Sequence, residues 1–258
     1  MSFNETFSII MPAHNAEATI EYSINSVLNQ TDQDFQLIIV NDASTDNTQK
    51  IIDRYNDERI IKLVNKVNLG VAETRNRALN IATGRYIAFL DSDDVWRRNK
   101  LERQRREFNN GHLLVCSAYC IMDNDGTVND KKIFFKENIE YKDMLKSNFI
   151  ANLTGCYDSQ MLGKFYQKKI GHEDYVMWLD ILSVAKVAYC IPECLAVYRI
   201  ANHSVSSNKI RAMHWQFNIY RQYLKMNIAK AVYYFIHYAI NALKKRWLFM
   251  YGRMLIEL

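Results

Sequence analysis

The sequence has few of the residues that interrupt regular structure. Its 258 residues include only two prolines and eight glycines, and no stretch is of low complexity or repeats at the period of a solenoid. These scarcities exclude linker-joined modules and repeat architectures. Apolar residues make up 49% of the chain, which is enough for a sizeable core, so we expect one folded body with at most one appendage.

A secretory signal is also missing, because the chain begins with the polar segment Met1-Ser2-Phe3-Asn4-Glu5. We therefore expect a protein of the reducing cytoplasm, whose five cysteines form no disulfides. The pairs Cys116/Cys120 and Cys190/Cys194 suggest zinc ligands, but thiols in apolar, strand-like runs are more often small core residues. Core packing is the favoured interpretation.

Neither familiar glycine-rich phosphate loop occurs, so a bound nucleotide would be held by a metal ion and side chains. The candidate segment is Asp91-Ser92-Asp93-Asp94, which follows a strand-like run at residues 86–90. Clustered carboxylates raise one another's pKa unless a cation compensates them, and Mg²⁺ commonly uses one or two carboxylates together with substrate phosphates. A solvated acidic turn is the alternative. An EF-hand loop fits poorly, because Val95 and Trp96 stand where its ligand and Gly should be.

Hydrophobic patterning predicts an α/β fold. Strands are expected at residues 7–11, 35–40, 60–64 and 86–90, and helices at 16–28, 45–55 (capped by Ser44) and 71–82. This alternation indicates right-handed parallel crossovers and a sheet with helices on both faces. Ligands of such sheets bind at the carboxyl ends of the strands.

Beyond residue 101 the pattern changes. Strand-like runs at 113–122 and 131–135 flank Asp125-Gly126, a hairpin signal, so the sheet should become mixed while remaining mostly parallel. A helix is expected at 174–184, strands at 186–191 and 195–199, and helix almost throughout from about residue 209. We place a catalytic domain at residues 1–204 and a helical extension at 205–258.

Polar residues follow each of the first four strands. The segments are Pro12-Ala13-His14-Asn15-Ala16-Glu17, Asn41-Asp42-Ala43-Ser44-Thr45-Asp46, Asn68-Leu69-Gly70-Val71 leading to Arg75, and the acidic cluster at 91–94. Over residues 7 to about 200 they resemble the large family-two glycosyltransferases, which are inverting enzymes with the GT-A nucleotide-sugar fold. The combination is far more specific than any one segment.

The resemblance implies a nucleoside pocket after the first two strands. The residues implied to line it are Pro12, Ala13, His14, Asn15 and Glu17. His14 stands where an aromatic residue such as Tyr is common in the family. Asp42 would accept the N–H of uracil, whose single imide donor suits a carboxylate. Helix capping near Ser44 is the alternative role for Asp42.

The resemblance places the diphosphate around the acidic cluster. Arg75 would contact the diphosphate through its guanidinium, and Arg77 is the competing assignment, on a different helical face. Asp91 and Asp93 would hold the ribose and the metal, with Ser92 between them and Asp93 as the direct ligand. The cation, Mn²⁺ or Mg²⁺, would neutralise the leaving diphosphate.

Gly171-His172-Glu173-Asp174 resembles the acidic pair that supplies the family's catalytic base. Asp174 is favoured as the group that takes the acceptor's proton, with Glu173 as second choice. Alternatively, both acids only favour the dipole of a helix start. Trp178, one turn later, would stack on an acceptor sugar or pack in the core.

Residues 198–206 are similar to the family's closing segment, which can fold over the diphosphate. Arg199 is the preferred phosphate contact there. His203 could complete the metal coordination or donate to phosphate, and an ordinary surface histidine is the alternative.

The end of the chain is strongly basic. Residues 199–258 contain ten Lys and Arg and one acid, Glu257, so this segment carries +9 in a chain whose net charge is +5. The apolar run at 231–243 is too short to span a bilayer, but Tyr and Trp interleaved with cations suit a helix lying among lipid headgroups. We favour peripheral membrane contact over packing on the catalytic core, and expect no nucleic acid.

The resemblance leads to one functional expectation. The chain would be a metal-dependent inverting enzyme that moves a hexose, galactose or glucose, from a UDP-sugar to an undecaprenyl-diphosphate-linked saccharide. It would act in surface polysaccharide (O-antigen, lipopolysaccharide) synthesis at the inner face of the bacterial plasma membrane. The alternatives are a non-catalytic module that binds membrane or nucleic acid through a degenerate sugar-nucleotide fold, and a metal-dependent nucleotidyltransferase, which would release pyrophosphate.

Overall fold

The first half of the chain alternates strands and helices, as the patterning predicts. In the computed structural model, which describes residues 5–123, 126–200 and 209–251, the order is β1 (Phe7–Ala13), α1 (Ile20–Leu28), β2 (Phe35–Asn41), α2 (Thr48–Asp53), β3 (Ile60–Val64), α3 (Val71–Ile81) and β4 (Tyr86–Phe89). β1 pairs in parallel with β2 and β4, and β2 pairs in parallel with β3. Every residue of β1 and β4 is buried, as expected of strands covered on both faces.

Two helices begin later than the pattern predicts. α1 starts at Ile20 and α2 at Thr48, because the polar residues before them form loops. Ser44 does not cap α2, whose N-cap is Asn47. The Ser44 hydroxyl instead donates to Asn41 Oδ1 and accepts from the Asn15 backbone N–H at 3.0 Å.

The second half of the chain adds short elements among the predicted ones. They are β5 (Val95–Trp96), α4 (Lys100–Asn109), β6 (Leu114–Met122), β7 (Val128–Ile133), β8 (Asn138–Glu140), α5 (Tyr141–Met144), η1 (Asn152–Thr154), β9 (Cys156–Asp158), α6 (Ser159–Leu162), α7 (Glu173–Ala185) and β10 (Val187–Arg199). The two strands predicted at 186–191 and 195–199 are one strand, β10. Its register is irregular after Ile191, around Pro192, which cannot donate to the ladder.

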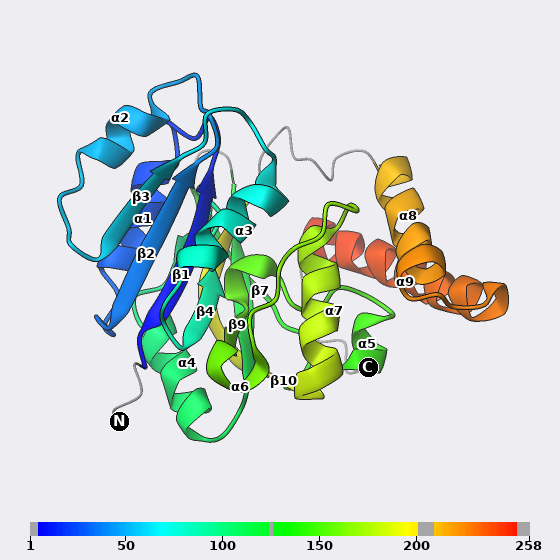
Figure 1. Cartoon of the computed structure of the whole chain (residues 1–258). Helices are drawn as coiled ribbons and strands as arrows, with labels where there is room; N and C mark the ends of the chain where they lie inside the picture. The colour runs from blue at the N-terminus through cyan, green and yellow to red at the C-terminus, as the bar shows by residue number, and fades with distance from the viewer. Residues whose placement is uncertain (1–4, 124–125, 201–208, 252–258) are drawn as a thin grey trace.

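All these strands join one mixed sheet in the order β3-β2-β1-β4-β9-β6-β10-β5, with β7 beside β6 and β8 beside β10 (Figure 1). β9 runs antiparallel to both β4 and β6, so β6 and β10 point the same way as β1 to β4. Most strands therefore share one direction, which confirms a mixed, mostly parallel sheet. β7 pairs antiparallel with β6, as the hairpin signal predicts, although Asp125 lies outside the described residues.

Helices cover both faces of the sheet. α3 and α7 pack on one face around a core that includes Ile10, Leu79 and Trp178, and α1 and α4 pack on the other around Ile9, Ile24 and Leu101. The carboxyl ends of β1, β2 and β4 consequently open between α1 and α3. This is the edge at which the sequence places its polar loops.

The chain ends in α8 (Lys209–Asn218), a π-helical turn η3 (Ile219–Tyr223) and α9 (Ile228–Tyr251). This helical extension lies beside α7, at the end of the molecule opposite α2 (Figure 1). Ile219, Tyr220 and Ala231 belong to the same core as α7, so one side of the extension packs on the catalytic body. The predicted boundary at residues 204–205 lies outside the described residues.

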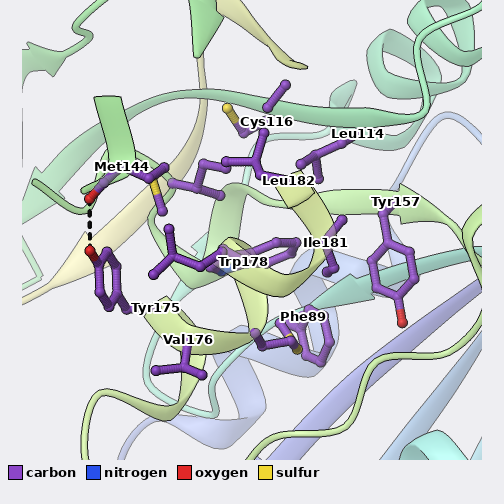
Figure 2. Packing of buried hydrophobic residues seen from close by; sticks show 14 of the residues in the cluster. Phe89, Leu114, Cys116, Met144, Tyr157, Tyr175, Val176, Trp178, Ile181 and Leu182 are labelled. Carbon is purple, nitrogen blue, oxygen red and sulfur yellow. Dashed lines mark hydrogen bonds between the residues drawn. The ribbon is translucent and has the colours of Figure 1, made fainter. Parts of the chain in front are cut away.

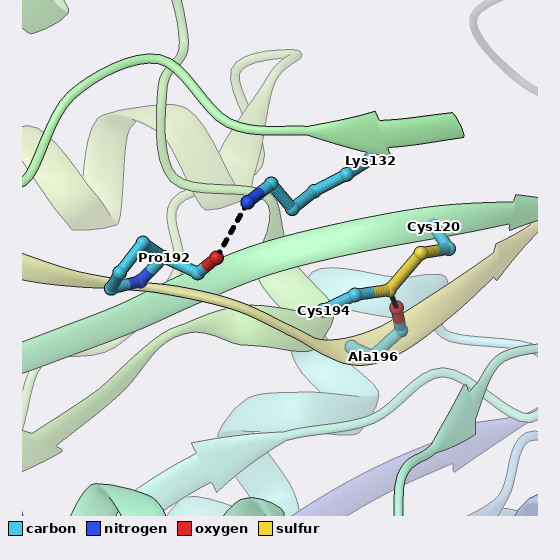
Figure 3. The surroundings of a disulfide bond; sticks show 5 residues. All are labelled: Cys120, Lys132, Pro192, Cys194 and Ala196. Atoms are coloured by element: carbon cyan, nitrogen blue, oxygen red, sulfur yellow. Dashed lines mark hydrogen bonds between the residues drawn. A yellow bond between two sulfur atoms is a disulfide. The ribbon is translucent and has the colours of Figure 1, made fainter. Parts of the chain in front are cut away.

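The expectation that no disulfide forms is wrong in the structure. Cys120 of β6 and Cys194 of β10 are bonded, with their Cα atoms 5.9 Å apart (Figure 3). The register irregularity after Ile191 aligns Cys194 with the middle of β6, a proximity that spacing along the chain does not reveal. Cys116 and Cys190 are free and buried, as core packing predicts.

Candidate active site

Asp42, at the end of β2, is held by three donors. Its Oδ1 accepts from Leu69 N (2.9 Å) and Asn65 Nδ2 (2.7 Å), and its Oδ2 accepts from Gly70 N (2.9 Å). Burial raises the pKa of Asp42, but these hydrogen bonds together outweigh it, so the pKa lies below its ordinary value. The carboxylate is charged at neutral pH, has capacity for another donor, and does not cap α2.

The His14 ring connects three loops at this edge. Its Nδ1 lies 2.8 Å from the backbone oxygen of Asp42, which can only accept, so Nδ1 carries the proton. Its Nε2 then accepts from Asn68 Nδ2 at 3.2 Å. The ring is thus fixed in orientation, with its partners in the β2 and β3 loops.

Side chains also tie the β1 loop to the β2 loop. Asn15 Oδ1 accepts from Thr45 N at 2.8 Å, and Glu17 Oε2 accepts from Asn47 N at 2.9 Å. Asn15 has a φ of +48°, a conformation that Asn tolerates better than most residues. Pro12 and Ala13 are the last two residues of β1, directly before this loop, and both are buried.

Arg75 is buried on α3 and points to Asp91, directly after β4. Its Nη2 lies 2.5 Å from Asp91 Oδ1, and its Nη1 donates to Gln167 Oε1 at 3.0 Å. Gln167 is itself clamped, because the Asn76 side chain donates to its backbone oxygen and accepts from its backbone N–H. The buried Arg75 Nε has no partner among the described residues.

The charge of Arg75 is maintained by the acids around it. Burial lowers the pKa of its guanidinium, but Asp91 and, with smaller effects, Asp174 and Glu173 raise it, and the net result is a raised pKa. Arg77 points away from Asp91, toward the end of β3, where its Nη1 donates to Val64 O at 2.7 Å. This agrees with the expectation that only one of the two arginines faces the acidic cluster.

Asp93 and Asp94 lie deeper than Asp91. Burial, reinforced by the charge of Asp91, raises the pKa of Asp93 to about 6. Burial also raises the pKa of Asp94, whose Oδ1 accepts from Arg199 N at 3.0 Å. Arg199 Nε donates to the backbone oxygen of Asp93 at 3.0 Å, so the end of β10 is fastened to the acidic loop. Ser92 lies between these acids and is half-buried.

Glu173 and Asp174 occupy the first turn of α7, as predicted, and both are partly exposed. Their loop is held from the helical extension. His172 Nε2 donates to Ala212 O at 3.2 Å, and its ring meets the Trp215 ring edge-on. Asp174 is close enough to Arg75 to raise its pKa, so the structure brings the α7 start near the Arg75–Asp91 pair.

The family model described as "Glycosyl transferase family 2" matches residues 8–171. The chain belongs to glycosyltransferase family 2. It is 41% identical over 244 residues to the putative teichuronic acid biosynthesis glycosyltransferase TuaG of Bacillus subtilis (strain 168), covering 93% of this chain and 96% of that one. It is 37% identical over 241 residues to the UDP-Glc:alpha-D-GlcNAc-diphosphoundecaprenol beta-1,3-glucosyltransferase WfgD of Escherichia coli, covering 92% and 94%.

Solved structures give the same fold for this glycosyltransferase. S. aureus TarS 1–349 in complex with UDP-GlcNAc superposes with a TM-score of 0.70 at 19% identity, over 91% of this chain and 71% of that chain. The mannosyltransferase PcManGT from Pyrobaculum calidifontis, in complex with GDP-Man and Mn²⁺, gives 0.67 at 16% identity, over 98% and 77%. The predicted family and GT-A fold are confirmed.

One site assignment needs correction. Trp178 does not face an acceptor: its side chain is fully buried, edge-on to Phe89 and Tyr157 with centroids 5.7 and 6.4 Å away (Figure 2). A Cβ added at Gly155 would lie 2.4 Å from the indole, so the fit is close. Although Trp178 shares a helical face with Asp174, one turn of helix is enough to pass from the open edge into the core.

Other parts of the site lie beyond what the sequence revealed. His203 lies outside the described residues. Asn65, Asn76 and Gln167 were not predicted, since each acts by holding a named site residue, and amides in loops carry no signal of their own. Asp94 was visible only as part of the acidic run.

An open groove of about 570 Å³ adjoins the acidic loop. It runs between α1 and the segment after β4, and its lining includes Tyr22, Asn25, Trp96, Arg98 and Arg199. Neither Arg75 nor Asp174 lines it, so this groove lies beside the predicted chemistry rather than at it. Arg199, which binds the Asp93 backbone, is the link between the two.

The acidic loop has the donor set that a hard divalent cation requires. Asp93 is a half-buried carboxylate whose pKa is raised to about 6, so the cations of the described residues compensate its charge only in part. Among the residues that the structure describes, no three His, Cys, Asp or Glu side chains converge as a protein-only metal site. The carboxylates of Asp91 and Asp93 are ligands of the type that Mn²⁺ or Mg²⁺ uses together with substrate phosphates.

Proposed function

We propose that this glycosyltransferase moves glucose from UDP-glucose to a saccharide linked through diphosphate to undecaprenol, with inversion at the anomeric carbon. The observation that carries the proposal is the approach of two acidic groups at one sheet edge, with the Arg75–Asp91–Asp93 cluster on one side and Asp174 on the other. WfgD, which matches this chain over nearly its full length, supports the choice of donor and acceptor by its name. Galactose is the second candidate sugar.

Donor binding would begin at the loops after β1 and β2. Asp42 is charged and oriented by Leu69, Gly70 and Asn65, so it can accept a hydrogen bond from the uracil imide N–H without a rearrangement. The cross-links from Asn15 and Glu17 to the neighbouring loop keep this edge rigid. A rigid pocket loses less entropy on binding.

The diphosphate would lie beside Arg75, whose buried Nε has no partner among the described residues and whose charge is secured by Asp91. Asp93 is the expected direct ligand of the divalent cation, with Asp91 beside it. When bound, the cation neutralises the negative charge of the leaving UDP. Arg75 would add a second, fixed positive charge that stabilises the negative charge developing on the leaving diphosphate.

Asp174 would act as the general base. The acceptor hydroxyl attacks the anomeric carbon from the side opposite the diphosphate, and the carboxylate takes the hydroxyl proton as the new bond forms. UDP-glucose carries glucose as an α-glycoside, so the beta linkage in the name of WfgD means inversion in that protein. The same outcome is proposed here.

The lipid acceptor implies work at the inner face of the plasma membrane. Within the described residues, no helix is long and apolar enough to cross a bilayer. We propose that the protein reaches its lipid-linked acceptor by peripheral contact with the membrane.

The test is UDP release by the purified protein with UDP-glucose, UDP-galactose and UDP-N-acetylglucosamine in Mn²⁺ buffer, with and without a short-chain lipid diphosphate of N-acetylglucosamine. We expect acceptor-dependent release from UDP-glucose and its loss in Asp93→Asn. Release from another donor alone would replace the sugar, and pyrophosphate in place of UDP would make the chain a nucleotidyltransferase. No donor binding by calorimetry would leave only a non-catalytic module.

A further inference from the structure

α9 exposes a continuous apolar stripe. Its members are Ile228, Val232, Ile236, Ile240 and Leu243, which follow one another at intervals of four, four, four and three residues and are 40–68% exposed. This spacing puts them on one side of a helix. Tyr233, 51% exposed, widens the stripe on one flank. Large aliphatic side chains gathered in this way need a partner surface.

The opposite side of α9 already has its partners. Ala231 is fully buried, the Tyr234 ring lies 6.2 Å from the Tyr220 ring, and Asn241 Nδ2 donates to Lys146 O at 3.1 Å. These contacts fasten the helix to the catalytic body. The stripe is therefore directed away from the core, and the part of the chain that the structure describes does not cover it.

The surroundings of the stripe are cationic. Lys225, Lys230 and Lys244 are exposed on the extension, Lys244 directly after Leu243, and between Arg199 and the end of the chain Glu257 is the sole acidic residue. An apolar stripe with an exposed tyrosine, carried on a cationic extension, matches the interface of an anionic bilayer, where acyl chains meet negative headgroups. A protein partner would be expected to require a more varied set of groups.

We propose that the stripe of α9 is the surface by which this glycosyltransferase docks on an anionic lipid bilayer. The inference rests on the proposed lipid-linked acceptor and names the contact that it requires. The helix lies in the plane of the membrane, with its isoleucines inserted among the acyl chains and its lysines at the phosphates.

Docking through this surface places the acceptor near the catalytic acids. The helical extension touches the segment that leads into α7, because Trp215 of α8 packs against Gly171 and His172, directly before Glu173 and Asp174. The charge of Asp174 also raises the pKa of Tyr238 of α9, so the same short extension that carries the stripe lies close to the proposed base. A diphosphate-linked saccharide emerging from the bilayer would meet the site over a short path.

The experiment is co-sedimentation of the full-length protein with vesicles of phosphatidylcholine, with and without phosphatidylglycerol. We expect binding to the mixed vesicles that weakens as salt is added. The variant Ile236→Asn/Ile240→Asn should bind roughly tenfold or more weakly, since two inserted side chains are lost. Lys230→Gln/Lys244→Gln should lose the preference for phosphatidylglycerol.

The matched control is Ile81→Asn/Val184→Asn, which changes two exposed aliphatic residues of α3 and α7 in the same way. It should bind vesicles like the wild type. Wild-type binding that is absent, or unaffected by the stripe variant, overturns the proposal. A dimer that the stripe variant dissociates, without vesicle binding, would overturn it in favour of an interface between two copies.

The proposed reaction can be separated from docking. With a short-chain acceptor that stays in solution, the stripe variant should release UDP at the wild-type rate, whereas with a long-chain acceptor in vesicles it should be slower by a similar tenfold. Equal rates in vesicles would sink the docking surface and leave the reaction intact. If the wild type itself released no UDP with either acceptor, the proposed function would be wrong.

Discussion

Arg75 and Asp91 form an ion pair between α3 and the end of β4, with Nη2 2.5 Å from Oδ1 and the arginine side chain only 7% exposed. The pair assigns different tasks to neighbouring carboxylates. Asp91 has one oxygen committed to the guanidinium, whereas Asp93, one residue beyond Ser92, is half-buried and has no ion pair among the described residues. This difference favours Asp93 as the direct ligand of a cation and Asp91 as the group that holds Arg75.

The planar guanidinium of Arg75 should be required for activity, so that another cationic side chain cannot replace it. Arg75→Lys keeps the charge but cannot contact Asp91, Gln167 and a diphosphate together. We expect kcat/KM for UDP release to fall roughly 10²-fold. Arg77→Lys, a change of the same kind one helical face away, should alter it less than about threefold. Equal losses in the two variants would contradict the assignment of Arg75 to the site.

Asp174 should control the chemical step and leave donor binding alone. Asp174→Asn removes the proton acceptor, so kcat should fall by roughly 10²- to 10⁴-fold while the affinity for UDP-glucose, measured by calorimetry, stays within about threefold. Glu173→Gln is the matched change on the adjacent residue and should cost much less. If Glu173→Gln proves the more damaging, the two acids exchange roles.

The contact between the helical extension and the start of α7 can be tested at Gly171. Its φ is +79°, and an added Cβ would lie 2.5 Å from the Trp215 ring. Gly163 has a similar φ of +84° with nothing within 4 Å of the added atom, so Gly163→Ala carries the backbone strain without the clash.

We expect Gly171→Ala to lower kcat by roughly tenfold beyond Gly163→Ala, because the start of α7 must shift to relieve Trp215. A change in the near-ultraviolet circular dichroism of the tryptophans should accompany the loss. Matching kcat values for the two variants would mean that the extension does not position the acids.

Local patterning predicted the strands that build the site because each is a short, buried apolar run that ends in polar residues. β3 matches its predicted bounds, and the ends of β1, β2 and β4 fall within two residues of theirs. β5 and β9 were not predicted, since they are two and three residues long and exist only through pairing with distant strands.

The misses inside the site have the same cause. The bond between Cys120 and Cys194, the burial of Trp178 and the clamp of Asn76 on Gln167 all join segments far apart in the sequence. A pattern of residue types within one segment predicts the structure of that segment from the sequence alone. Contacts set by the register of a whole sheet cannot.

Lys100 illustrates a further limit, because α4 has the sequence of a solvated helix and yet this lysine is fully buried. Its Nζ donates to Gln104 Oε1 at 2.6 Å and lies 3.9 Å from the centre of the Trp96 ring. Burial lowers its pKa from 10.5 to about 7, with only small opposing effects from Cys156 and Cys116. Between pH values of about 7 and 10.5, the Lys100 amine is therefore charged in the unfolded chain and neutral in the folded chain.

The consequence is a distinctive dependence of stability on pH. Between about 7 and 10.5 the unfolded chain binds a proton at Lys100 that the folded chain does not, so the free energy of unfolding should rise as the pH increases through this window. Below about pH 7 both states are protonated at Lys100, so the folded chain bears the full cost of the buried charge and this contribution levels off.

Lys100→Met has no proton to lose and should lack the rise, although Gln104 Oε1 loses its donor, which costs about 1–3 kcal/mol. The measured quantity is therefore the slope of the free energy of unfolding against pH and not its absolute value. Both proteins are unfolded in urea at several pH values across the window, and Lys50→Met, a change at an exposed lysine, is the control. The wild type and Lys50→Met should run parallel and rise relative to Lys100→Met, and three parallel curves would show that Lys100 stays protonated in the folded state.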